Sequence, residues 1–167
     1  MSSRIVTNFM RQQGFGEEPD DALRAHFDGL TFQPRIVFPS VLLAIVLQSP
    51  WLHLAISAVL WWNTLVPALN PFERAYSRWI ARPRGCEPLV PAPGPRRMAQ
   101  GMAAAFNLGA GVALLTGHTT FAWVMEAFLV VGFSALLFGR FCVGAYVYHL
   151  LKGRVAFANS TLPWSKG

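Results

Sequence analysis

Long apolar stretches make up most of this chain, and shorter charged segments separate them. Residues 36–69 and 98–139 contain no Lys or Arg and a single carboxylate, Glu126. A bilayer has a hydrocarbon core about 30 Å thick, which a helix of about 20 residues crosses. The second stretch, with 42 residues, therefore predicts two spans joined by a tight turn. The first, with 34 residues, predicts two more, divided at Gln48-Ser49-Pro50.

The segment before this division is the shortest of the four predicted spans. It holds only about 13 strictly apolar residues, a length that also fits a re-entrant segment. We expect a full span, because Leu30, Phe32 and the aliphatic part of Arg35 lengthen it at the headgroup end. The predicted fold is an all-α integral membrane protein, with four transmembrane helices in two hairpins and an interfacial amphipathic helix between them.

The segment between the hairpins begins with a strong helix signal. Asn70 as N-cap, Pro71 at the first helical position and Glu73 at the third predict a helix start. Apolar side chains share one face and arginines the other, which indicates a helix in the cytoplasmic interface or, alternatively, one that docks on a soluble partner. The apolar face carries Phe72, Ala75, Tyr76, Trp79 and Ile80, and the basic face carries Arg74, Arg78 and Arg82. Five prolines within residues 83–95 then predict an extended connector.

The N-terminal arm, residues 1–34, has weaker patterns. Ile5, Val6, Phe9 and Met10 recur at helical spacing and predict a short surface helix. Asp20 or Asp21 is a candidate cap for a second helix, which would carry Leu23, Phe27 and Leu30. The alternative is a loosely ordered tail, as is common at chain termini.

Small residues recur every fourth position along the third predicted span: Gly101, Ala105, Gly109, Ala113 and Gly117. At this spacing they share a helix face that a neighbouring backbone can approach closely. We expect this stripe to pack on the fourth span of the same chain, with another subunit as the alternative. In either case it indicates structure and not catalysis.

Composition and charge support this topology. Only 13% of the residues are charged and 53% are hydrophobic, whereas soluble domains carry about a quarter charged residues. Lys and Arg outnumber Asp and Glu by 14 to 8 and flank the predicted spans, but the two hairpin tips carry none. Since basic residues near span ends remain in the cytoplasm, we expect both termini and the middle segment there. The expected partner of this charge is anionic lipid, and no nucleic acid is expected.

These boundaries divide the chain into five segments. They are a cytoplasmic arm (1–34), a first hairpin (35–69), an interfacial helix with its connector (70–97), a second hairpin (98–151) and a cytoplasmic tail (152–167).

Glu126 is the one carboxylate at membrane depth, and such a group suggests function because its charge is costly there. Asn107 and Asn63 are possible hydrogen-bonding partners. The sequence pattern suggests no second titratable group beside it, and it places His53 near the outer end of its span. No imidazole is expected at the depth that a haem or chlorophyll ligand needs, and no metal, nucleotide or cofactor motif is present, so no cofactor is expected.

The fourth predicted span continues into Phe141-Cys142-Val143-Gly144-Ala145-Tyr146-Val147-Tyr148. Over roughly Thr31 to Leu151, the chain resembles a family of small bacterial four-span membrane proteins of unknown function, whose last span ends in Phe-Cys-Leu-Gly-Cys followed by Tyr. The resemblance implies that Cys142, Gly144 and Tyr148 are motif positions, while Ala145 replaces the second cysteine. A pair of thiols at such a place would suggest thiol exchange, in which the second thiol resolves the mixed disulfide. Its loss here favours Cys142 as a small packing residue.

The leading functional hypothesis is therefore a non-catalytic accessory or scaffolding subunit of a larger membrane complex, with a respiratory or photosynthetic complex as a candidate host and other membrane subunits as partners. One alternative is a thiol- or sulfur-handling protein that uses Cys142. A second is a small transporter or proton pathway that uses Glu126. Cys86 and Cys142 both fall on the predicted cytoplasmic side, where thiols stay reduced, so no structural disulfide is expected.

Overall fold

The computed structural model describes residues 3–15, 20–86 and 90–165, and within these ranges the chain forms helices and turns without a strand. The α-helices are α1 (Ser3–Gln13), α2 (Asp20–Val46), α3 (Pro50–Leu65), α4 (Pro71–Tyr76), α5 (Gly94–Leu115), α6 (Thr119–Leu137), α7 (Val143–Leu151) and α8 (Val155–Ser160). Short 3₁₀ turns lie at η1 (Pro67–Leu69) and η3 (Arg82–Arg84), and a π-helical turn lies at η2 (Ser77–Ala81). The prediction of an all-α fold is confirmed.

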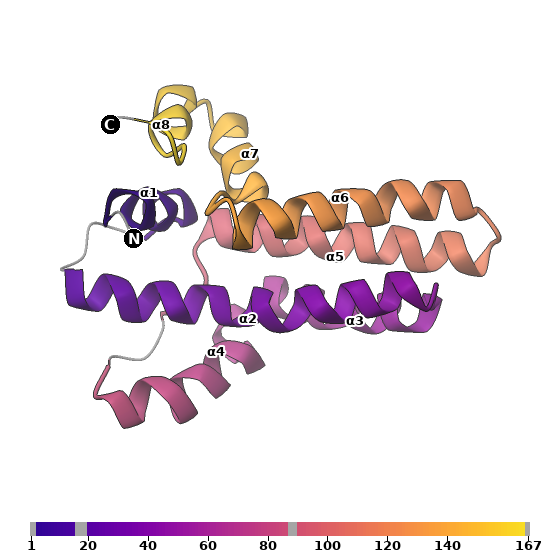
Figure 1. Cartoon of the computed structure of the whole chain (residues 1–167), viewed down its shortest axis with the longest axis horizontal. Coiled ribbons are helices and arrows are strands. Elements are labelled where there is room, and N and C mark those ends of the chain that lie inside the picture. Colours follow the sequence, from indigo (N-terminus) through magenta and orange to yellow (C-terminus); the bar gives the residue numbers. More distant parts are fainter. Residues whose placement is uncertain (1–2, 16–19, 87–89, 166–167) are drawn as a thin grey trace.

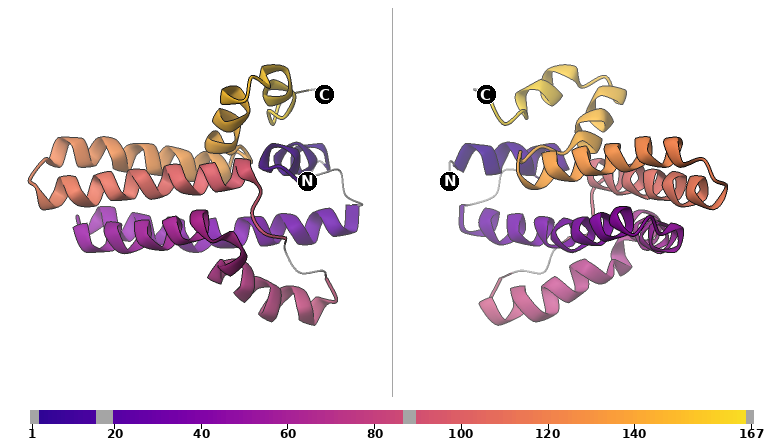
Figure 2. Two further views of the ribbon diagram at one scale, coloured as in Figure 1. Left: turned by 180° about the vertical axis from the view of Figure 1, so that it is seen from behind. Right: turned by 45° about the vertical axis from the view of Figure 1, so that its right-hand side comes forward.

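Four helices run along the long axis of the molecule, as Figure 1 shows for α2, α3, α5 and α6. The α2–α3 and α5–α6 turns lie at one end, here called the turn end. Both chain termini and α1, α4, α7 and α8 lie at the other, here called the terminal end, in all views (Figures 1 and 2). Helix α3 packs most extensively on α5, and α5 also packs on α6 and α7. A buried apolar layer of Val37, Val41, Leu60, Ala104 and Leu129 fills the middle of this bundle.

Three helical segments are long and apolar enough to cross a membrane. They are Phe27–Val46, Gly94–Leu115 and Thr119–Leu137, with 20, 22 and 19 residues. The chain is therefore that of a membrane protein. Helix α3 is apolar as well, but its 16 residues fall short of the roughly 20 that a full crossing needs.

The first predicted span is longer than expected. Helix α2 is continuous from Asp20 to Val46 and runs through Pro34 and Pro39, so the second arm helix and the first span are one element. The arm is also ordered: in α1, Val6, Phe9 and Met10 are buried against Phe27 and Leu30 of α2. The predicted first arm helix is thus confirmed, and a second helix does begin at Asp20, but it continues without a break into the first span. The side chains of Asp20, Asp21 and Leu23 lie outside the described part of the chain.

The last predicted span does not run on to Tyr148. Helix α6 ends at Leu137, and α7 begins afresh at Val143 and leaves the bundle at a steep angle (Figure 1). Arg140 has a left-handed backbone with φ of 52°, which a continuous helix does not allow. Cys142 is the N-cap residue of α7, and its backbone N–H donates to Gln12 Oε1 of α1 at 2.8 Å. The expected helix end at Cys142 is therefore a helix beginning.

The helix start at Asn70 is confirmed. Asn70 Oδ1 accepts from the backbone N–H groups of Phe72 and Glu73 at 3.0 and 3.4 Å, and Pro71 occupies the first helical turn. The π-helical turn then shifts the register of the predicted faces, so that Tyr76 and Ala81 are buried but Trp79 is 72% exposed. Its neighbours Arg74, Arg78 and Arg82 are exposed too. Residues 87–89 of the predicted connector lie outside the described residues.

Candidate functional sites

The facing sides of α3 and α5 carry polar groups, while the outside of the bundle is apolar. On α3 the buried residues are His53, Ser57, Leu60 and Asn63, and on α5 they include Arg96, Gln100, Ala104 and Asn107. Ser57 Oγ donates to the Ala104 carbonyl at 2.8 Å, which ties the two helices together. Between the ends, the apolar layer separates two polar clusters.

The first cluster surrounds Glu126, about 10 Å into α6 from the turn end at 1.5 Å per residue. Gln48 Nε2 donates to both carboxyl oxygens at 3.2 Å, and His53 Nε2 lies 3.4 Å from Oε1. His53 Nδ1 is 3.0 Å from Asn107 Oδ1. Glu126 is 4% exposed and His53 is 0% exposed. The structure thus unites four polar side chains from the α2–α3 turn and three helices.

This geometry corrects two expectations. A titratable group does accompany Glu126, and an imidazole is fully buried inside the bundle. Asn107 bonds to His53 and not directly to Glu126. Asn63 is not part of the cluster, and neither polar atom of its side chain has a hydrogen-bonding partner among the described residues. The signal that was available is spacing, because His53 precedes Ser57 by four residues and Leu60 by seven and so shares their helix face.

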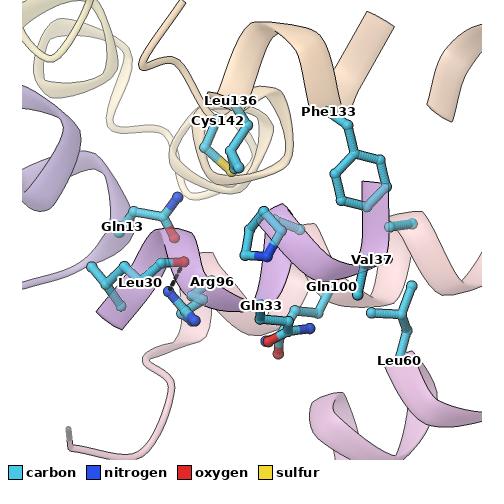
Figure 3. A pocket seen from close by; sticks show the side chains of 13 residues that line it. Gln13, Leu30, Gln33, Val37, Leu60, Arg96, Gln100, Phe133, Leu136 and Cys142 are labelled. Carbon is cyan, nitrogen blue, oxygen red and sulfur yellow. Dashed lines mark hydrogen bonds between the residues drawn. The ribbon is translucent and has the colours of Figure 1, made fainter. Parts of the chain in front are cut away.

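The second cluster lies at the terminal end and surrounds Cys142. A cavity of about 60 Å³ separates Cys142 and Gln13 from Arg96, Gln33 and Gln100 (Figure 3). Burial raises the pKa of the Cys142 thiol, although the N–H groups of Ala145 and Gly144, the Gln13 side chain and the Arg96 charge oppose this rise. Desolvation dominates, so the resting group is the neutral thiol.

The far wall of this cavity contains a buried ion pair. Arg96 is 5% exposed, and its guanidinium lies 3.3 Å from Glu73 Oε1 and donates to the Leu30 carbonyl at 3.3 Å. Gln100 Nε2 donates to Gln33 Oε1 at 2.9 Å. Within the described chain, Arg96 Nε and Gln100 Oε1 lack a hydrogen-bonding partner. Desolvation raises the pKa of Glu73 against the opposing effect of the Arg96 charge.

The residues of the Cys142 motif have clear packing roles. A Cβ added at Gly144 would lie 2.5 Å from Ala99 Cα, so glycine lets α7 touch the backbone of α5. The Tyr148 hydroxyl lies over Gly94, where an added Cβ would be 2.8 Å away. Ala145, at the place of the second cysteine, is fully buried. Cys86 and Cys142 are both free, and Cys86 is not among the residues that line the Cys142 cavity.

The small-residue stripe does not form a single interface. Gly101 faces Thr64 and Trp61 of α3, whereas Gly109 faces Met125 and Phe121 of α6. Ala113 is buried, Ala105 is exposed and Gly117 lies beyond α5 in the turn, with φ of 77°. The reason is that α5 is contacted on two sides, by α3 and by α6, so that positions four apart meet different neighbours. Compared with Gly101 and Gly109, Gly111 lies closer to its neighbours, because a Cβ added there would be 2.9 Å from Leu54 and 3.1 Å from the Pro50 carbonyl.

Apolar bundle helices and a terminal cap of short helices define this chain as an all-helical membrane protein with buried polar clusters. Residues 28–153 match the model of a family described as a domain of unknown function, DUF4395, and the chain belongs to this family. No curated protein and no solved structure matches the chain.

Proposed function

We propose that the chain lies in the bacterial inner membrane as four spans in two hairpins, with both termini cytoplasmic. The terminal end carries Arg4, Arg11, Arg140, Lys152 and Arg154, and none of the 14 basic residues lies in either turn of the turn end. This distribution supports a cytoplasmic terminal end. In this arrangement α3, continued by η1, is the shortest span. Exposed Trp79 and the arginines of α4 and η2 then meet anionic headgroups at the membrane surface.

Within this membrane we propose that the protein is a non-catalytic accessory subunit of a larger complex. The observation that carries this proposal is an uncovered part of the small-residue stripe. Gly101 and Ala105 line a shallow groove on α5 together with Thr64, Arg97 and Met98. Inside a membrane, helix association depends on close packing of small residues, and such a groove admits another helix. A transmembrane helix of a partner subunit is therefore the proposed occupant.

Co-purification in mild detergent tests this role. An affinity-tagged chain is expected to retain its partner subunit, whereas Ala105→Leu is expected to lose it by filling the groove. Val112→Leu is the matched control, because Val112 is also exposed on α5 but lies outside the groove. If the native chain runs as a lone monomer, or if both variants bind alike, the subunit proposal is wrong.

A second candidate function is thiol chemistry at Cys142, which the surrounding cavity favours. Burial raises the pKa of the Cys142 thiol, but two backbone N–H groups, the Gln13 amide and the Arg96 charge oppose this rise and would stabilise the thiolate once it forms. The thiolate would attack a sulfur of a disulfide, RS–SR, to give the mixed disulfide and release RS⁻. Without a second thiol at Ala145, an external thiol must complete the exchange.

Reaction with 4,4′-dithiodipyridine tests this candidate, because each mixed disulfide releases one coloured thiopyridone. In the folded chain the native protein is expected to release thiopyridone in two phases, and Cys142→Ala is expected to retain only the phase of Cys86. The candidate fails if Cys142 stays unmodified in the folded chain while Cys86 reacts.

A further inference from the structure

The Glu126 cluster has hydrogen-bond directions that its neighbours determine. Asn107 Nδ2 donates to the Ala103 carbonyl at 2.9 Å, so Oδ1 is the atom that faces His53. A carbonyl oxygen only accepts, and therefore His53 Nδ1 must carry a hydrogen. In the neutral imidazole this leaves Nε2 as a bare lone pair, and Nε2 is the atom that faces Glu126.

Gln48 is oriented in the same way. The indole Nε1 of Trp123, which only donates, lies 3.3 Å from Gln48 Oε1. Gln48 Nε2 donates to the Ile45 carbonyl at 2.8 Å and to both oxygens of Glu126. The carboxyl group thus accepts from Gln48 on one side and meets His53 Nε2 on the other.

A bare Nε2 lone pair and an ionised carboxylate repel each other at 3.4 Å, and both groups are almost completely buried. One hydrogen between them removes the repulsion, either on the carboxyl or on Nε2. Both forms have zero net charge, which the membrane interior favours. We infer that Glu126 and His53 form a binding site for a single shared proton.

In the part of the chain that the structure describes, no other charge is positioned to compensate this pair. The parts of α2, α3, α5 and α6 within residues 36–69 and 98–139 contain no Asp, Lys or Arg and no other Glu. The groups that face the pair are the amides of Gln48 from the α2–α3 turn and Asn107 from α5. His118, in the α5–α6 turn, is exposed and bonds to Thr116 at 3.0 Å. The pair therefore determines its own charge state.

Access to the site is one-sided. Gln48 and Trp123 are exposed at the turn end and connect Glu126 to the surface. Towards the terminal end, the Ser57 hydroxyl donates its hydrogen to the Ala104 carbonyl at 2.8 Å, and the buried apolar layer of Val41, Leu60 and Leu129 offers no titratable side chain that a proton could use. The proton thus exchanges with the face on which the turns lie and does not cross the bundle. The site binds a proton and is not a proton channel.

Counting the hydrogens at neutral pH tests the shared proton. The native full chain in lipid nanodiscs, labelled with ¹⁵N-histidine, is expected to show His53 with hydrogen on Nδ1. Infrared spectroscopy is expected to show a protonated Glu126 carboxyl. If it shows an ionised carboxylate instead, the ¹⁵N signal of His53 is expected to show a hydrogen on Nε2 as well. A bare Nε2 together with an ionised Glu126 would overturn the inference. Because the count uses the native chain, it does not depend on whether a variant folds.

Two variants and a flux measurement complete the test. Glu126→Gln is expected to leave a neutral His53 and to abolish any protonated-carboxyl band, whereas His118→Gln is expected to change neither. In proteoliposomes with a pH gradient, proton flux is expected to stay at the level of empty vesicles. Sustained flux that Glu126→Gln removes would contradict one-sided access.

Discussion

Gly144 shows how a single missing side chain positions the Cys142 cluster. We expect Gly144→Ala to destabilise the protein by about 1–3 kcal/mol, because the new Cβ would lie 2.5 Å from backbone atoms of α5 that cannot move aside. Gly132→Ala is the matched control on α6, where an added Cβ meets nothing within 4 Å. There the change is expected to be neutral or to stabilise by up to about 1 kcal/mol through helix propensity. Thermal unfolding in detergent measures both, and equal midpoints for the two variants would contradict the close contact.

The stability of the folded chain depends on pH through Glu73, which lies at the terminal end. Burial raises the pKa of Glu73 in the folded state above the ordinary value of 4.5. At pH values between the unfolded and the folded pKa, the folded chain therefore binds more protons than the unfolded chain. The contribution of Glu73 to stability is therefore complete below about pH 4.5 and falls as the pH rises through the folded pKa. Glu73→Gln is expected to remove this fall. Unfolding midpoints across this pH range check the sign, and a native midpoint that rises through the same window would refute it.

At the scale of elements, the cap of α4 is the clearest case of local sequence determining structure. We expect Asn70→Ala to cost about 1 kcal/mol, because two backbone N–H groups of the first turn lose their acceptor. Asn70→Asp keeps an acceptor oxygen and is the control. Hydrogen exchange of residues 71–81 is expected to rise in the alanine variant and to stay near native in the aspartate variant. Equal exchange in both would show that packing on α2, and not the cap, holds this helix.

The difference between local signals and tertiary packing explains which elements the sequence predicts. The start of α4 and the amphipathic α1 follow from signals within a few residues, and both are present. The break at Arg140 follows from tertiary structure, since α7 is held by Gln12 of α1 and by Ala99 of α5, far away in sequence. The apolar stretch ends at Gly139, directly before this break, but apolar residues resume at Phe141, so the pattern alone does not show that a new helix begins there. The π-helical turn at Ser77–Ala81 likewise has no signal in the pattern of apolar and basic positions, and it moved Trp79 to the surface.

The candidate sites were predictable only in part, for a related reason. Glu126 and Cys142 stand out in the sequence by their chemistry, but their partners come from other elements. His53 reaches Glu126 because α3 and α6 both pack on α5, and Arg96 reaches the Cys142 cavity because α7 folds back on α5. Sequence reasoning assigned His53 to the outer end of its span by counting residues. That placement agrees with the start of α3 at Pro50, and the helix face that His53 shares with Ser57 indicates in addition that its side chain is buried.

At the scale of the whole molecule, the two ends differ in a way that predicts an orientation in the membrane. The turn end consists of two tight turns, with the proton site about 10 Å inside it at 1.5 Å per helical residue. The terminal end gathers α1, α4, α7 and α8, the basic side chains and the Cys142 cavity (Figure 1). Asn8 of α1 bonds to the Leu162 carbonyl at 3.2 Å, and Arg140 stacks on Phe27 at 4.8 Å. The chain's own helices therefore hold its terminal segments in place.

This asymmetry predicts the accessibility of single cysteines in bacterial cells. His118 lies in an exposed turn at the turn end, whereas Cys86 follows η3 at the terminal end. In a Cys86→Ser background, His118→Cys is expected to react with a membrane-impermeant maleimide in intact spheroplasts. In the native chain, Cys86 is expected to react only after the membrane is permeabilised, while the fully desolvated Cys142 stays slow in both conditions. The reverse pattern would place the turn end in the cytoplasm. The basic residues would then face the outside, and the proton site would respond to cytoplasmic pH.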